Sequence, residues 1–127
     1  MKLLANIFTV LVLIEHIYIL VVEMFLWTTP YGMKVFNLTE EFALKSAPLA
    51  ANQGLYNGFL AAGILWAFLN KDKIHAYNTK LFFVGCVIVA ALYGAYSVDI
   101  SILIKQGTPA IIAMALLLFT AKAQKEL

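Results

Sequence analysis

The sequence predicts an all-α membrane protein, a bundle of four transmembrane helices with a short amphipathic segment after the first helix. Of its 127 residues, 63% are hydrophobic and 13% are charged, whereas soluble domains have about 45–50% apolar and about 25% charged residues. The apolar residues also gather in four long stretches separated by shorter polar segments, as membrane spans do. At this length we expect one integral membrane domain that covers residues 1–127.

The first predicted span, residues 3–27, is an apolar run long enough to cross the hydrocarbon core of a bilayer, which is about 30 Å thick. Lys2 in front of it is typical of a signal peptide, but the run is too long for one and no cleavage site of small residues follows. We therefore expect a helix that is retained. Pro30 cannot continue a helix and Gly32 permits a turn, so the span is expected to end before them.

Residues 33–47 mix apolar and charged side chains, which is typical of a short amphipathic helix on the membrane surface. Thr39, followed by Glu40 and Glu41, fits a helix start. A threonine side chain can accept a hydrogen bond from the first turn, and carboxylates stabilise that end of a helix. An irregular loop is the alternative for this segment.

The second predicted span covers residues 48–69, with Pro48 in its first turn, where proline fits a helix. Gly54 and Gly58, continued by Ala62, form a ridge of small residues that favours close packing against another helix. The first half of the span also carries three amide side chains: Asn52, Gln53 and Asn57.

Residues 70–80 are predicted to form a polar loop, and residues 81–98 the third span. The fourth span is predicted at residues 108–121, after Gly107 and Pro109 restart the chain. Between these two spans the sequence leaves two alternatives open, an extension of the third helix or a separate connection.

Four spans would place the N-terminus, the 70–80 loop and the C-terminus on one side of the membrane. All nine basic residues are lysines, and six of them belong to that side while three belong to the other. Because lysines are enriched in cytoplasmic segments, both termini are expected in the cytoplasm. The side with more lysines holds Lys2, Lys71, Lys73, Lys80, Lys122 and Lys125, and the other side holds Lys34, Lys45 and Lys105.

Three ionisable side chains interrupt the first span, and we predict that they carry the function: Glu15, His16 and Glu23. A carboxylate at the bilayer centre costs about 2.5–3.5 kcal/mol or more, so ionisable residues at this depth usually mark a functional site. His16 and Glu23 are seven positions apart and share one face, while Glu15 points about 100° away from His16. Either carboxyl group is expected to act as an acid or base, with His16 exchanging the proton.

Polar residues of the second and third spans are predicted to complete this site. Close approach at Gly54 and Gly58 would bring the amides of the second span against the face of His16 and Glu23. There the amides would orient a polar head group, while two tyrosines at the outer end of the third span would wall the pocket. The predicted ligand-binding residues are Asn52, Gln53, Asn57, Tyr93, Tyr96 and Asp99.

The sequence indicates no metal, no cofactor and no nucleic-acid partner. A di-iron bundle needs Glu-x-x-His on two helices, and the chain contains no such motif. Its single cysteine, Cys86, and its two histidines form no cluster with the spacing of a zinc site. The formal net charge of +2 is too small to indicate binding to nucleic acid.

Three blocks of the sequence resemble a known family. They are Glu15-His16-Ile17-Tyr18, Glu23-Met24-Phe25-Leu26-Trp27 and Asn52-Gln53-Gly54-Leu55-Tyr56-Asn57-Gly58-Phe59-Leu60-Ala61-Ala62-Gly63. Over its whole length the chain resembles the small bacterial four-helix inner-membrane proteins called domain of unknown function 1304. The resemblance implies a bacterial source and a multi-pass fold in the inner (plasma) membrane. It implies no activity, so the function has to be argued from the polar residues.

Three functions fit these residues. The preferred one is a pocket that binds a small amphipathic molecule, with or without acid–base chemistry on it. The second is a proton-linked transporter or exporter of small molecules, for which so short a chain would act as a homodimer. The third is a structural or partner subunit, in which the polar residues hold helices together.

Overall fold

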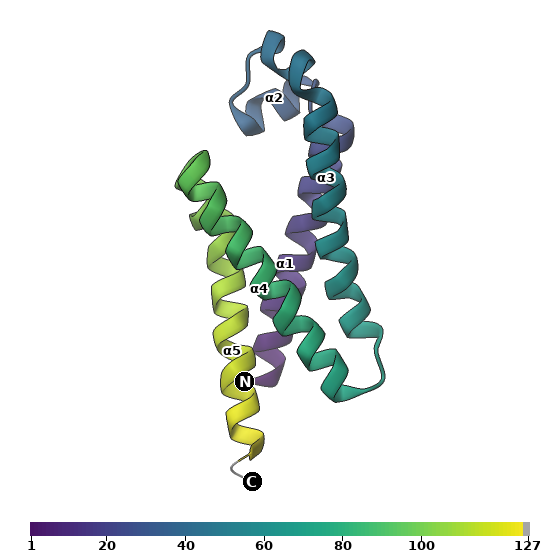
Figure 1. Ribbon diagram of the computed structural model, residues 1–127, viewed down its shortest axis with the longest axis vertical. Coiled ribbons are helices and arrows are strands. Elements are labelled where there is room, and N and C mark those ends of the chain that lie inside the picture. Colours follow the sequence, from purple (N-terminus) through teal and green to yellow (C-terminus); the bar gives the residue numbers. More distant parts are fainter. Residues whose placement is uncertain (126–127) are drawn as a thin grey trace.

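The computed structural model describes residues 1–125, and the side chains of residues 1–120. It is a bundle of helices, which confirms the predicted all-α class, and no strand occurs within residues 1–125 (Figure 1). The four long helices are α1 (Lys2–Val21), α3 (Glu40–Leu69), α4 (Lys73–Ser97) and α5 (Thr108–Lys125).

The first helix is longer than α1 alone, because a π-helical turn, η1 (Val22–Leu26), continues it without a break. Together they make an apolar stretch of 25 residues. Pro30 does more than end this stretch, since it is the first residue of a short helix, α2 (Pro30–Phe36). Thr29 caps α2 by accepting a hydrogen bond from the Gly32 N–H, and Asn37 ends it in the left-handed conformation with φ 53°.

The predicted amphipathic segment 33–47 is divided between two helices. Its first part belongs to α2, and its second part is the start of α3, which Thr39 caps by accepting from the Phe42 N–H. The helix start expected at Thr39 is therefore confirmed. Pro48, by contrast, lies inside α3 and not in a first turn. The cap at Thr39 starts the helix earlier, and the continuous helix forgoes the one backbone bond that proline cannot donate.

The predicted polar loop 70–80 is much shorter in the structure. Asp72 accepts hydrogen bonds from the N–H groups of Ile74 and His75, and this cap starts α4 at Lys73. At the other end of α4, residues 98–102 form a turn that connects to a second π-helical segment, η2 (Leu103–Gly107). This segment leads directly into α5. The connection between the last two long helices is therefore a separate, mostly helical segment.

Three helical stretches are long and apolar enough to cross a membrane: Lys2–Leu26, Lys73–Ser97 and Leu103–Thr120. They make the chain a membrane protein by length and composition. The longest helix, α3, has 30 residues and contains the whole predicted span 48–69, but the three amides make its first half more polar.

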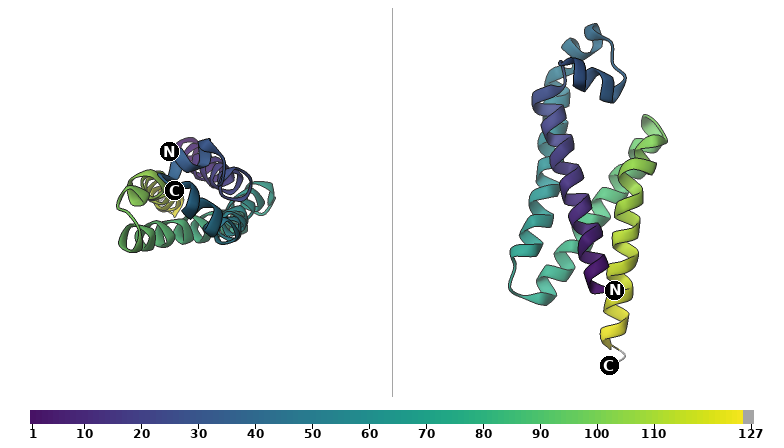
Figure 2. Two further views of the ribbon diagram at one scale, coloured as in Figure 1. Left: turned by 90° about the horizontal axis from the view of Figure 1, so that it is seen from above. Right: turned by 180° about the vertical axis from the view of Figure 1, so that it is seen from behind.

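Neighbouring helices pack in the order α1, α3, α4 and α5, and α5 packs back against α1, whereas α1 and α4 share few contacts. Both termini lie at the end of the bundle where α3 turns into α4 (Figure 1). Towards the other end, the pair α1–α3 and the pair α4–α5 diverge, as the view from behind also shows (Figure 2). The buried core is small and aliphatic, with Ala5, Val12, Ile64, Val84, Val87, Ala110, Ala113 and Leu117.

Helix α3 contacts different partners along its length. Near its middle Gly54 and Gly58 face Leu20 of α1, which confirms the close approach expected there. In its second half Gly63 lies against the ring of Phe83 on α4. Ala62 is exposed, so it does not continue the ridge.

Candidate functional site

A hydrogen bond joins the first helix to α3 at the level of the π-helical turn. Asn57 Nδ2 donates to Glu23 Oε2 over 3.0 Å, and both side chains are half-buried. The two helices can come this close because Gly54 has no side chain. A Cβ at this position would lie only 2.7 Å from Met24 Cγ and 3.0 Å from Glu23 Cβ. Glu23 lies in η1, and such π-helical turns occur often at functional sites.

The hydrogen bonds of Asn57 determine which atoms this pair can offer to a ligand. Besides Glu23, its Nδ2 donates to the Gln53 carbonyl at 3.1 Å, so both amide hydrogens are used. The amide oxygen of Asn57 and the Oε1 of Glu23 have no hydrogen-bond partner among the side chains described, residues 1–120. The pair therefore presents two free acceptor atoms.

His16 is satisfied by its own helix. Its side chain is 1% exposed, and Nδ1 lies 2.8 Å from the Val12 carbonyl. Because a carbonyl can only accept, Nδ1 carries the hydrogen and Nε2 is the nitrogen left to accept a proton. Thr9 lies on the same buried face and donates to the Ala5 carbonyl at 2.7 Å. No hydrogen bond within residues 1–120 links His16 to Glu23, which lies about 10 Å further along the axis by helical rise.

Glu15 is the unsatisfied member of the group. It is half-buried, and its Oε2 is the one buried side-chain oxygen or nitrogen without a hydrogen-bond partner in the part of the chain described. Buried polar atoms in folded proteins almost always have a hydrogen-bond partner. We therefore expect this oxygen either to be protonated or to accept a hydrogen bond from a donor outside the chain.

The other predicted site residues are not brought to Glu23. Asn52 and Gln53 lie on the same half of α3, but their side chains are exposed. Tyr93 and Tyr96 are 69% and 89% exposed at the end of α4, which contacts η2 and α5 there and diverges from η1 (Figure 1). They therefore form no wall beside the Glu23–Asn57 pair.

Asp99 has a local partner. Its Oδ1 accepts a hydrogen bond from the Ser101 N–H at 2.7 Å at the start of the next helical turn. Hydrogen bonds from Ser101 hold the pKa of this exposed carboxyl below its usual value. Asp99 thus caps the segment that leads into η2, far from Glu23.

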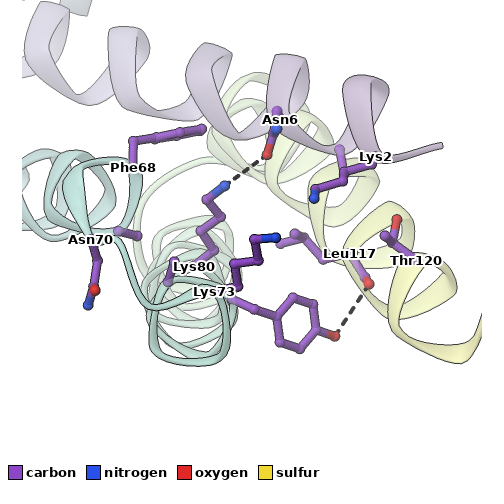
Figure 3. Close-up of a pocket in the computed structure, with 12 residues that line it drawn as sticks. Lys2, Asn6, Phe68, Asn70, Lys73, Lys80, Leu117 and Thr120 are labelled. Atoms are coloured by element: carbon purple, nitrogen blue, oxygen red, sulfur yellow. Dashed lines mark hydrogen bonds between the residues drawn. The ribbon is translucent and has the colours of Figure 1, made fainter. Parts of the chain in front are cut away.

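The structure also contains a cavity that the sequence reasoning missed, at the end of the bundle where both termini lie. It has a volume of about 340 Å³ and is lined by three lysines, Lys2, Lys73 and Lys80 (Figure 3). The sequence signal was the excess of lysine at this end of the spans, which was used only to orient the chain in the membrane. None of the predicted site residues lines this cavity.

Comparison with known proteins identifies a family of unknown function. Residues 10–118, which include all the predicted site residues, match the model of a family described as "Protein of unknown function (DUF1304)". The chain is also 32% identical over 117 residues to the "Uncharacterized protein YpaA" of Lactococcus lactis subsp. lactis (strain IL1403), a match that covers 90% of this chain and 96% of that protein. No solved structure matches the chain.

Proposed function

We propose a function for this chain, which belongs to the DUF1304 family of proteins of unknown function. It is a multi-pass protein of the bacterial inner membrane in which Glu23 and Asn57 bind the polar group of a small amphipathic molecule. The observation that carries the proposal is the 3.0 Å bond between Glu23 and Asn57, which holds two free acceptor atoms at one point between two helices.

The arrangement of the helices supports a fourth crossing by α3. Near the start of α1, Asn6 accepts a hydrogen bond from Lys80, near the start of α4, at 2.8 Å. Two helices that begin at one face of the membrane and cross it require a helix between them that returns, and α3 lies between them in the chain. The excess of lysine at this end favours a cytoplasmic position for both termini, which would put Glu23 near the outer face.

The free atoms of the site indicate the chemistry of its ligand. Because both amide hydrogens of Asn57 are already donated, the ligand must bring its own donor. An amine or a hydroxyl head group would donate to Glu23 and Asn57, and its apolar part would lie along the exposed aliphatic side chains beside them. A carboxylate in this position can also accept a proton from the ligand, so acid–base chemistry on the bound molecule is compatible with the same geometry.

The experiment compares the molecules that remain bound to the purified protein. Native mass spectrometry of wild-type protein in a mild detergent is expected to show an added mass, and an organic extract should identify it as a compound with an amine or hydroxyl group. Glu23→Gln keeps an acceptor for Asn57 but loses the charge, and it should lose the added mass without a change in melting temperature. Glu40→Gln, an exposed carboxylate at the start of α3, is the matched control.

A structural role is the second candidate, because the same bond joins two helices directly. On that reading the wild-type protein carries no specific added mass, and the substitutions change only stability. An added mass that Glu23→Gln and Glu40→Gln retain equally would contradict binding at this site.

A further inference from the structure

The lysine-lined cavity lies between four elements of the fold. The start of α1, the α3–α4 turn, the start of α4 and the end of α5 all contribute to it. Its volume of about 340 Å³ falls within the range of small-molecule sites, about 300–1,000 Å³. In Figure 3 the side chains of Lys2, Lys73 and Lys80 gather around one space, with Asn6 and Phe68 beside Lys80.

The charge of the cavity is positive and uncompensated in the part of the chain whose side chains are described. No carboxylate from residues 1–120 lines it. The ion pairs within residues 1–120 are Lys45 with Glu41 and His75 with Asp72, so neither involves the three lysines of the cavity. Three ammonium groups around one space repel each other, and an anion between them would relieve that repulsion.

Lys80 is held in place before any ligand binds. Its Nζ donates to Asn6 Oδ1 at 2.8 Å and lies 3.9 Å from the centroid of the Phe68 ring. The ammonium group has three N–H donors, and the bond to Asn6 uses one of them. A lysine fixed in this way loses little rotamer freedom when it binds, which favours affinity.

From these contacts we propose that the cavity binds a phosphate-bearing anion, supplied by the head group of an anionic phospholipid. Lysine binds phosphate as a point charge, and basic pockets between membrane helices on the cytoplasmic side are suited to anionic lipid head groups. The site lies at the end of the spans where such head groups are found, and Leu117 and Phe68 offer apolar contact for the adjoining acyl chain. The proposal is independent of the Glu23–Asn57 site.

The test measures lipid binding to the full chain by native mass spectrometry. Purified protein is titrated with phosphatidylglycerol and, separately, with phosphatidylcholine, and a third arm adds inorganic phosphate and follows the melting temperature. We expect phosphatidylglycerol to bind at least about five-fold more tightly than phosphatidylcholine, and added salt to weaken it. A loss of about five-fold is expected for Lys80→Gln and for Lys73→Gln, from about 1 kcal/mol per lysine near an anionic head group.

Two variants sharpen the test. Lys71→Gln removes an exposed lysine from the same turn that does not line the cavity, and it should leave the affinity unchanged. Lys80→Arg keeps the charge and should keep most of the binding. Binding by this variant would show that the loss in Lys80→Gln comes from the missing charge and not from misfolding. Stabilisation by inorganic phosphate in wild type but not in Lys80→Gln, with no preference between the lipids, would support the cavity and identify a free phosphate compound as the source. Equal losses in Lys71→Gln and Lys80→Gln, or no binding of either anion, would overturn the proposal.

Discussion

The three ionisable side chains of the first helix differ in their hydrogen-bond partners. Glu23 receives a hydrogen bond from another helix, His16 bonds to the backbone of its own helix, and Glu15 has an oxygen with no partner in the described part of the chain. The sequence places all three at membrane depth but does not distinguish these states. Which partner a side chain meets depends on the rotation and separation of the neighbouring helix, and for Glu23 the glycine at position 54 determines that separation.

A double-mutant cycle should measure the energy of the Glu23–Asn57 bond. Glu23→Ala, Asn57→Ala and the double variant are expected to give a coupling of about 0.6 kcal/mol or more, since hydrogen bonds between membrane helices average about 0.6 kcal/mol and reach about 1.7 kcal/mol. The measurement is reversible unfolding in mixed micelles. A cycle between His16 and Asn57, which share no hydrogen bond, is the control and should give a coupling within about 0.5 kcal/mol of zero. A Glu23–Asn57 coupling no larger than this control would contradict the bond.

The cap at Asp72 should make the start of α4 sensitive to acid. Hydrogen bonds from the backbone and side chain of His75, and from the Ile74 N–H, hold the pKa of Asp72 below its ordinary value of 3.8. Because the folded pKa is lowered, this stabilisation is fully present above the unfolded pKa and is lost as the pH falls through the folded pKa, below 3.8. Hydrogen exchange of the first turn of α4 should therefore speed up below pH 3.8 beyond the intrinsic rate. Asp72→Asn, which caps without titrating, should remove this change, and an identical pH profile in the variant would contradict the role of Asp72.

At the scale of the elements, helix ends are easier to predict than helix starts: α3 and α4 end within one residue of the predicted 69 and 98, but each begins eight residues before the predicted 48 and 81. The sequence predicts the cap at Thr39, but it does not single out the equally good cap at Asp72, because the polar residues after Asp72 resemble a loop. Those residues continue α4, where Tyr77 packs against the buried core and donates a hydrogen bond to the Leu117 carbonyl at 3.3 Å. The π-helical turns had no signal, since they arise where tertiary packing shifts the helix register.

Two glycines of the long helices should respond oppositely to alanine. A Cβ at Gly54 would meet Met24 Cγ at 2.7 Å and the Leu20 carbonyl oxygen at 3.2 Å, whereas a Cβ at Gly85 meets only Met114 Cε at 3.6 Å. Gly85→Ala is expected to be neutral or stabilising, because alanine favours a helix by about 1 kcal/mol over glycine. Gly54→Ala should instead push α1 and α3 apart and be less stable than Gly85→Ala by about 1–3 kcal/mol. Thermal unfolding of both variants in one detergent tests the difference, and equal stabilities would contradict the close approach.

For the whole molecule, the sequence predicts the class of the fold but not the angle between the α1–α3 pair and the α4–α5 pair. Gly63 lies against Phe83 where α3 and α4 are in contact, and further along α4 diverges from the first helix, so Tyr93 and Tyr96 at its end lie away from Glu23 (Figure 1). Helical periodicity tells which residues share a face, and it contains no information about crossing angles. The sequence therefore predicts the close contact of α3 with the first helix at Gly54 and Gly58, but not the direction of α4.

The crossing of α3 determines the topology of the whole chain, and labelling can test it. In a Cys86→Ala background, Lys34→Cys in α2 and Lys71→Cys in the α3–α4 turn place one exposed thiol at each end of α3. If α3 crosses and the termini are cytoplasmic, an impermeant maleimide should label Lys34→Cys in intact spheroplasts and Lys71→Cys only after the membrane is opened. The reverse pattern would keep the four spans but invert the orientation, against the lysine distribution. Labelling of both thiols from the same side would mean that α3 does not cross, and Glu23 and Asn57 would then lie at a membrane surface instead of inside it.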